Sequence, residues 1–142
     1  MLDDLSGTQR PGLRESPRRK RLSILDDATN TVTLTSVETV TGGDGDDTVA
    51  YAAAMNGATV DLGDDNDSLT FAAGGATVTV TNVETVTGST SDDTVTVASY
   101  TTGAAIDLGD GTDTVVFGVG STAATVDVGD GSGQTGLAAG GF

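Results

Sequence analysis

The sequence predicts an all-β protein, a right-handed parallel β-solenoid with about five coils. Three observations support this fold class: valine and threonine alternate over long stretches, glycine and aspartate cluster between those stretches, and the chain repeats itself at a fixed interval. We expect the solenoid to cover residues 25–142 and to follow a disordered basic leader at residues 1–24.

The alternating segments predict the strands. TVTLTSVETV at 31–40 and ATVTVTNVETV at 76–86 place β-branched apolar residues at every second position over most of their length. This period is typical of strands with one buried face. Proline is absent after Pro17, and glycine clusters separate the segments, so we expect tight turns between short strands.

The repeat has a length of 46 residues. Val37–Gly42 recurs without gaps as Val83–Gly88, and Asp46–Val49 recurs as Asp92–Val95. The repeated units are therefore 37–82 and 83–128. Because a unit of this kind cannot bury its apolar face alone, its copies are expected to stack into a continuous core.

Smaller coils divide each repeat. The turn aspartates Asp47, Asp67, Asp93 and Asp113 are spaced by 20, 26 and 20 residues, and we interpret the six extra residues of the middle interval as a bulge or a longer turn. A coil of 20 residues fits two strands, one acidic turn and one neutral turn. We therefore expect every acidic turn to lie along one edge, with parallel strands about 4.8 Å apart.

The same register predicts the core. One inward column would contain Val49, Leu69, Val95 and Val115, and a second would contain Tyr51, Phe71, Val97 and Phe117. We interpret the aromatic residues as core packing instead of a binding platform.

The charges are segregated along the chain. All six basic residues lie between Arg10 and Arg21, and no Lys, Arg or His follows. Of the 21 acidic residues, three (Asp3, Asp4 and Glu15) precede residue 22, so the remaining segment has 21 − 3 = 18 acids and no base. This predicts no binding of nucleic acid and no association with anionic membranes.

Other classes of protein are excluded by composition. The chain has no Cys, which rules out disulfides and thiolate chemistry. No apolar run approaches the ~20 residues of a membrane span, and no signal peptide is visible. The basic leader could be an arm that binds nucleic acid or acidic surfaces, or a tag, an upstream piece of a longer chain or a wrongly assigned start.

Stacked acidic turns would need a counter-ion. Two unit charges ~5 Å apart repel by about 0.8 kcal/mol even in water, and several such pairs approach the whole stability of a domain. Calcium suits such turns because it takes 6–8 oxygen ligands from carboxylates and carbonyls, whereas magnesium demands stricter geometry and zinc or copper would prefer His or Cys. A metal-free solenoid with solvated acidic turns is the alternative.

The acidic turns resemble a known repeat. Residues 42–50, GGDGDDTVA, match every position of the nonapeptide G-G-x-G-x-D-x-U-x, and residues 108–116 match all but the first glycine. Residues 62–70 and 88–96 match in part, and residues 128–136 lack the aspartate. The chain thus resembles the repeats-in-toxin (hemolysin-type) calcium-binding proteins in a degenerate array with coils of 20 and 26 residues.

The resemblance implies a parallel β-roll with Ca²⁺ held between successive turns. Carried over position by position, it implies carboxylates and backbone carbonyls as ligands at Gly43, Asp44, Gly45, Asp47, Gly63, Asp64, Asp67, Asp93, Gly109, Asp110, Gly111 and Asp113. Because the coil spacing departs from that family, we expect fewer sites than a regular roll has, with the turn at 88–93 the weakest.

The predicted function follows from this resemblance. We expect a calcium-binding structural or adhesive segment of a secreted or cell-surface bacterial protein that folds when Ca²⁺ binds, and that is not an enzyme. It would belong to a longer repeat array or associate end to end. The alternatives are a threonine-rich face that binds a ligand or ice and, with less support, a polysaccharide-active enzyme, which the absence of basic side chains after Arg21 disfavours.

Overall fold

In a computed structural model, residues 20–23, 27–72, 74–98, 103–118, 124–132 and 134–137 are described, and every regular element among them is a β-strand. The strands are β1 (Lys20–Ser23), β2 (Thr31–Leu34), β3 (Val37–Thr41), β4 (Thr48–Tyr51), β5 (Met55–Asp61), β6 (Ser68–Phe71), β7 (Ala76–Thr81), β8 (Thr85–Thr87), β9 (Thr94–Val97), β10 (Ala105–Asp107), β11 (Thr114–Phe117), β12 (Thr125–Asp127) and β13 (Gln134–Leu137). None of the described residues forms a helix that could cross a membrane.

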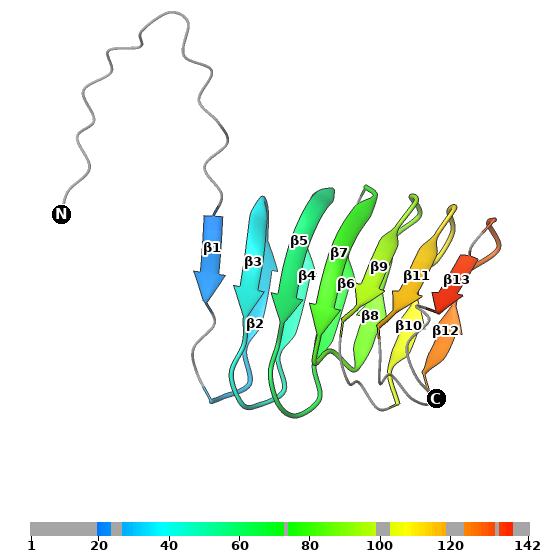
Figure 1. Ribbon diagram of the computed structural model, residues 1–142. Coiled ribbons are helices and arrows are strands. Elements are labelled where there is room, and N and C mark those ends of the chain that lie inside the picture. Colours follow the sequence, from blue (N-terminus) through cyan, green and yellow to red (C-terminus); the bar gives the residue numbers. More distant parts are fainter. Residues whose placement is uncertain are drawn as a thin grey trace, which may run out of the picture.

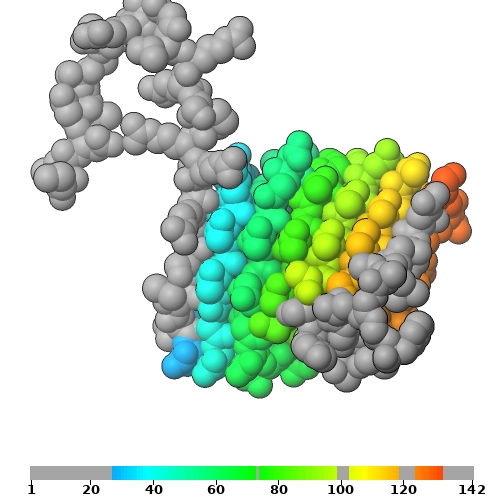
Figure 2. Space-filling model, in the orientation of Figure 1, coloured from blue at the N-terminus to red at the C-terminus, as the bar shows by residue number. Residues whose placement is uncertain are grey.

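The strands form two parallel sheets (Figure 1). Sheet A contains the odd-numbered strands in the order β1-β3-β5-β7-β9-β11-β13, and sheet B contains the even-numbered strands in the order β2-β4-β6-β8-β10-β12. The chain therefore alternates between the sheets and winds as a β-solenoid, which confirms the predicted fold class. Figure 2 shows successive strands as parallel bands across one face of the molecule.

The core lies between the two sheets. Valine and leucine side chains from both sheets are buried there, among them Val49, Val60, Leu69 and Val95, each with an exposed fraction of 0%. In the core Tyr51 stacks on Phe71 with ring centroids 6.3 Å apart, and Phe117 is also buried, so these three aromatics are core residues as predicted.

The 46-residue repeat exchanges the two sheets. β2 begins at Thr31 and its equivalent, shifted by 46, lies in β7; this step spans five strands, which at two strands per coil is two and a half coils. Consequently β4 belongs to sheet B, whereas its repeat equivalent β9 belongs to sheet A. The repeat thus advances along the solenoid and turns by half a revolution.

This half revolution corrects two of the predictions. The interval of 26 residues from Asp67 to Asp93 contains neither a bulge nor a longer turn but a third strand: it holds β6, β7 and β8, whereas a 20-residue interval holds two strands. The predicted continuous columns are therefore wrong. Val49 neighbours Leu69 in sheet B, but Leu69 then neighbours Val86, while Val95 and Val115 stack in sheet A.

Two short corners between strands accommodate the extra strand in the repeat. Ser36 and Asn82, which are 46 residues apart, have left-handed backbone angles of φ 57° and φ 50°. Each residue turns the chain sharply between two adjacent strands, β2 and β3 or β7 and β8. A corner of this kind replaces the longer glycine-rich turn and shortens the coil to 17 residues, the separation between Asp67 and Glu84.

The structure also places a strand within the expected leader. Lys20–Ser23 pairs in parallel with β3 as the outermost strand of sheet A. Residues 1–19, on which most of the leader prediction falls, lie outside the described residues.

Candidate metal sites on the two edges

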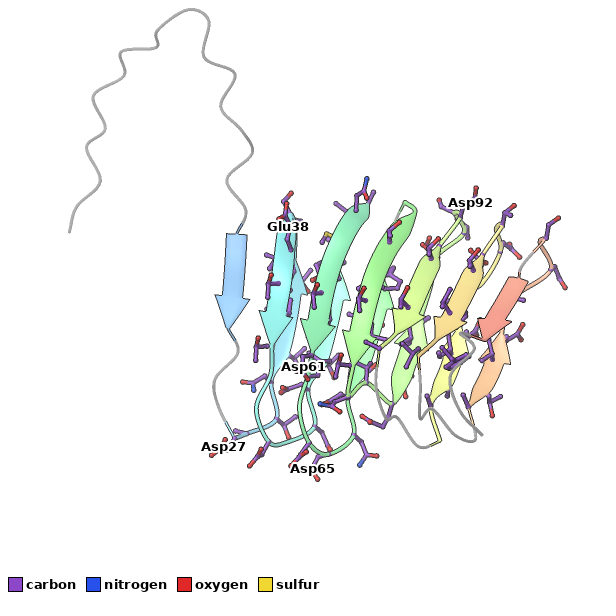
Figure 3. The ribbon with its side chains drawn as sticks, in the orientation of Figure 1. Asp27, Glu38, Asp61, Asp65 and Asp92 are labelled. Carbon is purple, nitrogen blue, oxygen red and sulfur yellow. The ribbon has the colours of Figure 1, made fainter. Side chains whose placement is uncertain are left out.

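The acidic turns lie on two opposite edges of the solenoid. At the first edge, where the chain passes from sheet A to sheet B, lie turns 42–47 and 62–67; at the second, where it returns to sheet A, lie turns 88–93 and 108–113. Figure 3 shows Asp27, Asp61 and Asp65 at one end of the strands and Glu38 and Asp92 at the other. The expectation of a single acidic edge is wrong, because the half revolution moves the second repeat's turns to the other side.

The first carboxylate column, at the first edge, consists of Asp47, Asp67 and Glu84. The backbone N–H of Asp47 donates to Asp67 Oδ1 at 2.8 Å, and the N–H of Asp67 donates to Glu84 Oε2 at 2.9 Å. Asn30 begins the column, with its N–H donating to Asp47 Oδ1 at 3.0 Å. Each carboxylate therefore links its own coil to the one before it.

The second carboxylate column, at the second edge, consists of Asp93 and Asp113. The N–H of Ala76 donates to Asp93 Oδ1 and that of Asp93 donates to Asp113 Oδ1, both at 2.7 Å. The Asp47–Asp67 and Asp93–Asp113 links are equivalent under the 46-residue shift, so the repeat reproduces the same contact on the opposite edge. The predicted aspartates are thus brought together as two pairs, and the pairs are separated by the width of the sheets.

The four predicted aspartates are buried. Asp47 and Asp67 are 1% exposed, and Asp93 and Asp113 are 0% exposed, although no Lys, Arg or His follows Arg21 in the sequence. Burial of a carboxylate is unfavourable unless its oxygens are paired. The hydrogen-bond partners of each carboxylate oxygen therefore show where a column lacks a compensating positive charge or donor.

Three of the four aspartates have an oxygen without a partner. The Oδ2 atoms of Asp47, Asp67 and Asp113 are buried and accept no hydrogen bond. Asp93 differs, because its Oδ2 accepts from the N–H and the Oγ of Ser89 at 2.9 and 3.2 Å. Ser89 occupies the turn that was expected to be the weakest site, and it completes the shell of Asp93 with protein donors.

Backbone carbonyls come close to the column carboxylates at two turn glycines. A Cβ added at Gly42 would collide with the carbonyl oxygen of Leu62 and would lie 2.7 Å from Asp47 Oδ2. A Cβ at Gly111 would lie 2.9 Å from both Asp113 Oδ1 and the carbonyl oxygen of Ser91. These glycines therefore pack directly against carboxylate and carbonyl oxygens, with no room for a side chain.

The remaining predicted site residues lie further out. Asp44, Asp64 and Asp110 are exposed, and the backbones of Asp44 and Asp64 form a parallel bridge between neighbouring turns. The glycines Gly43, Gly45, Gly63, Gly109 and Gly111 lie partly exposed in the same turns, and all except Gly43 have a positive φ. These turn residues can contribute oxygens at the surface, but they do not form the buried columns.

The sequence prediction missed Glu84 of the first column, and also Asn30 and Ser89, which donate to column carboxylates. Glu84 occupies the aspartate position of its coil, and its longer side chain reaches the Asp67 N–H across a shorter corner. Ser89 satisfies Asp93. The signal for Glu84 was the 17-residue spacing from Asp67, which matches the spacing from Asn30 to Asp47.

Burial and neighbouring charge raise the pKa of two column aspartates, Asp67 and Asp113. Desolvation, reinforced by the nearby carboxylates of Glu84, Asp47 and Asp46, raises the pKa of Asp67 from 3.8 to about 6. Desolvation also raises the pKa of Asp113, with Asp93, Asp92 and Asp110 contributing in the same direction. Asp67 and Asp113 therefore disfavour their own ionised form.

The potential donors at the columns are oxygen atoms. Among the described residues, no group of three or more His, Cys, Asp or Glu side chains is arranged to hold a metal ion. A cation at either column would therefore depend on backbone carbonyls and water beside one or two carboxylates, a donor set that calcium accepts and that zinc does not favour.

Comparisons of the sequence with protein-family models and curated proteins, and of the structure with solved structures, found no match. The resemblance of the turns to calcium-binding nonapeptides therefore rests on their residues alone.

Proposed function

We propose that this chain is a calcium-binding solenoid segment whose folding is coupled to Ca²⁺ at the two carboxylate columns. The observation that supports it is the set of three buried Oδ2 atoms without a partner, on Asp47, Asp67 and Asp113. A divalent cation would supply the positive charge that the sequence after Arg21 does not contain. When bound, it would neutralise the carboxylates and join successive turns.

The residues that would hold the ion differ between the edges. At the first edge they are Asp47 and Asp67 with the carbonyl oxygen of Leu62, and at the second edge Asp113 with the carbonyl oxygen of Ser91. Asp93 is left out because Ser89 already satisfies it. Outer carboxylates such as Asp64 would add long-range attraction for cations.

The biological role in this proposal is structural or adhesive. Sites built from carbonyls and one or two carboxylates suit the weak affinities of ~10⁻⁴–10⁻³ M that extracellular calcium modules use. We therefore place the chain in a secreted or cell-surface protein. The proposal assigns it no catalysis, because the solenoid after Arg21 offers no basic side chain to bind an anionic substrate or stabilise developing negative charge.

Thermal unfolding with and without calcium tests the proposal, using Asp67→Asn and Asp93→Asn as a matched pair. Both aspartates are buried column members that accept a backbone N–H, but only Asp67 has an unpaired oxygen. Calcium at 100 times its Kd should stabilise the native protein by about 2.7 kcal/mol per site. We expect Asp67→Asn to lose at least half of the rise in Tm and Asp93→Asn to keep most of it.

Magnesium and a chelator provide the controls. Magnesium at the same concentration should raise the Tm less than calcium, because it demands near-octahedral geometry. EDTA should abolish the strand signal of the protein in far-UV circular dichroism or strongly lower the Tm of the protein. An unchanged Tm on chelation, or an equal loss of calcium response in the two variants, would rule the proposal out.

A second candidate function has one observation in its favour. Outward threonines of sheet A stand in register on neighbouring strands, with Thr59, Thr79 and Thr96 forming one row and Thr77, Thr94 and Thr114 another. Rows of hydroxyl and methyl groups with a regular strand spacing could bind a neutral repeating surface such as ice. Thermal hysteresis by the folded protein, abolished by Thr79→Lys, would support this function, and its absence would exclude it.

A further inference from the structure

The two ends of the solenoid expose the ends of the same core column. In sheet B, the inward residues Val32, Val49, Leu69, Val86, Ile106 and Val126 are successive partners from β2 to β12. The four interior members are only 0–3% exposed, whereas Val32 and Val126 at the two ends are only partly buried. Burying these terminal valines would add apolar contact at both ends.

The outermost strands also leave backbone groups available for pairing. In the part of the chain that the structure describes, β2 pairs only with β4, and β12 pairs only with β10. In sheet A, β1 and β13 are likewise the first and last strands. Outermost parallel strands with free N–H and C=O groups are templates for adding a further strand.

The charge at the two ends is opposite. Two basic residues, Lys20 and Arg21, lie within β1 at the N-terminal end. Asp127, the last residue of β12, and Asp130 just after it are exposed at the other end. Attraction between the ends therefore favours a head-to-tail contact over contact between two like ends.

The strand count determines how two copies would join. The described solenoid has seven strands in sheet A and six in sheet B, so it begins and ends in the same sheet. A second copy continues the winding only if it is turned by half a revolution, which places its β1 beside β12 and its β2 beside β13. The strands of the two copies then run in the same direction within each sheet. Sheet A of one copy continues into sheet B of the next, as happens between the two 46-residue repeats inside the chain.

We propose that the C-terminal end of the solenoid, formed by β12 and β13, binds the N-terminal end of a second copy of this chain, formed by β1 and β2. The contact is head to tail and turned by half a revolution. Because such an interface is heterologous and does not close, it extends into linear oligomers. This inference does not depend on calcium being the ligand of the carboxylate columns.

Sedimentation velocity of the full chain, with calcium present throughout, tests the proposal with Val32→Glu and Val126→Glu. Both valines are half-buried at opposite ends, so each variant should keep its fold, which circular dichroism checks. The wild-type chain should form a concentration-dependent series of oligomers that weakens as salt is raised. Each variant alone should associate at least tenfold more weakly, while Thr59→Glu, an exposed change far from the ends, should associate like wild type.

Mixing the two variants distinguishes head-to-tail contact from the other arrangements. Val32→Glu keeps an intact C-terminal end and Val126→Glu keeps an intact N-terminal end, so the mixture should form a dimer that does not grow. If Val32→Glu alone still forms dimers, the contact joins two C-terminal ends and the proposal is wrong. A wild-type chain that stays monomeric at all concentrations would also overturn it.

Discussion

At the residue scale, glycine controls how closely successive turns approach. Gly63 has φ 104°, and a Cβ on it would collide with the carbonyl oxygen of Gly43 in the turn above. Gly57 has φ 81°, but a Cβ on it would meet no atom within 4 Å. The two positions therefore separate the cost of an unusual backbone angle from the cost of steric overlap between coils.

Substituting each of these glycines by alanine should give different losses of stability. Gly57→Ala should lower the free energy of unfolding by about 1–2 kcal/mol, the cost of a side chain at positive φ. Gly63→Ala should lose a further ~1–3 kcal/mol, because the crowded turn must shift. Denaturant unfolding of both variants at saturating calcium measures the difference; equal losses would mean that the turns are not packed as described.

At the element scale, the strands were predictable but their assignment to sheets was not. Alternating Val and Thr identify the strands, and the aspartates at 47, 67, 93 and 113 were correctly singled out as equivalent positions. The sheet that a strand joins depends on how many strands precede it. Short corners at Ser36 and Asn82 each shorten a coil and so change how many strands precede the next acidic turn. Their left-handed φ values have no clear signal in the composition, so the second acidic edge was missed.

The carboxylate columns should make stability without metal depend on pH. The pKa of Asp67 is raised to about 6 from 3.8, so the folded state binds a proton more tightly than the unfolded state does. Its contribution to stability is therefore full below pH 3.8 and is lost as pH rises through about 6. The metal-stripped protein should have a higher Tm at pH 5 than at pH 7.5.

The Asp67→Asn variant serves as the control for this dependence. It removes the titrating group, so the change in Tm between pH 7.5 and pH 5 should shrink, whereas Asp44→Asn at an exposed turn position should retain the wild-type change. With calcium bound, the direction should reverse, because protons then compete with the metal for the carboxylate. An identical pH dependence in Asp67→Asn and wild type would contradict the assignment.

At the scale of the whole molecule, the repeat and the coil are different units. One repeat of 46 residues contains five strands, so it cannot return to the sheet in which it began. Contacts at both edges are nevertheless the same: Asp46 Oδ1 accepts from the N–H of Asn66 at 3.0 Å, and Asp92 Oδ1 accepts from the N–H of Thr112 at 2.8 Å. Because each strand interacts mainly with its neighbours, stability should depend on local register and not on which sheet a strand occupies.

Deleting one whole repeat tests this independence. Removal of residues 48–93, which is 46 residues, joins Asp47 to Thr94 and preserves the local sequence Asp-Thr-Val on both sides of the junction. We expect the shortened chain to fold with calcium, at a lower Tm and with a smaller denaturant m-value in proportion to its lost surface. Its turn at 108–113 would move to the first edge, where Asp113 would replace Asp67 below Asp47.

Removal of residues 48–70, half as many, would instead join Asp47 to Phe71 and turn inward residues outward, so this shorter deletion should not fold. Far-UV circular dichroism and thermal unfolding of the two deletions decide the matter: if both are unfolded, the strands depend on contacts beyond their neighbouring coils.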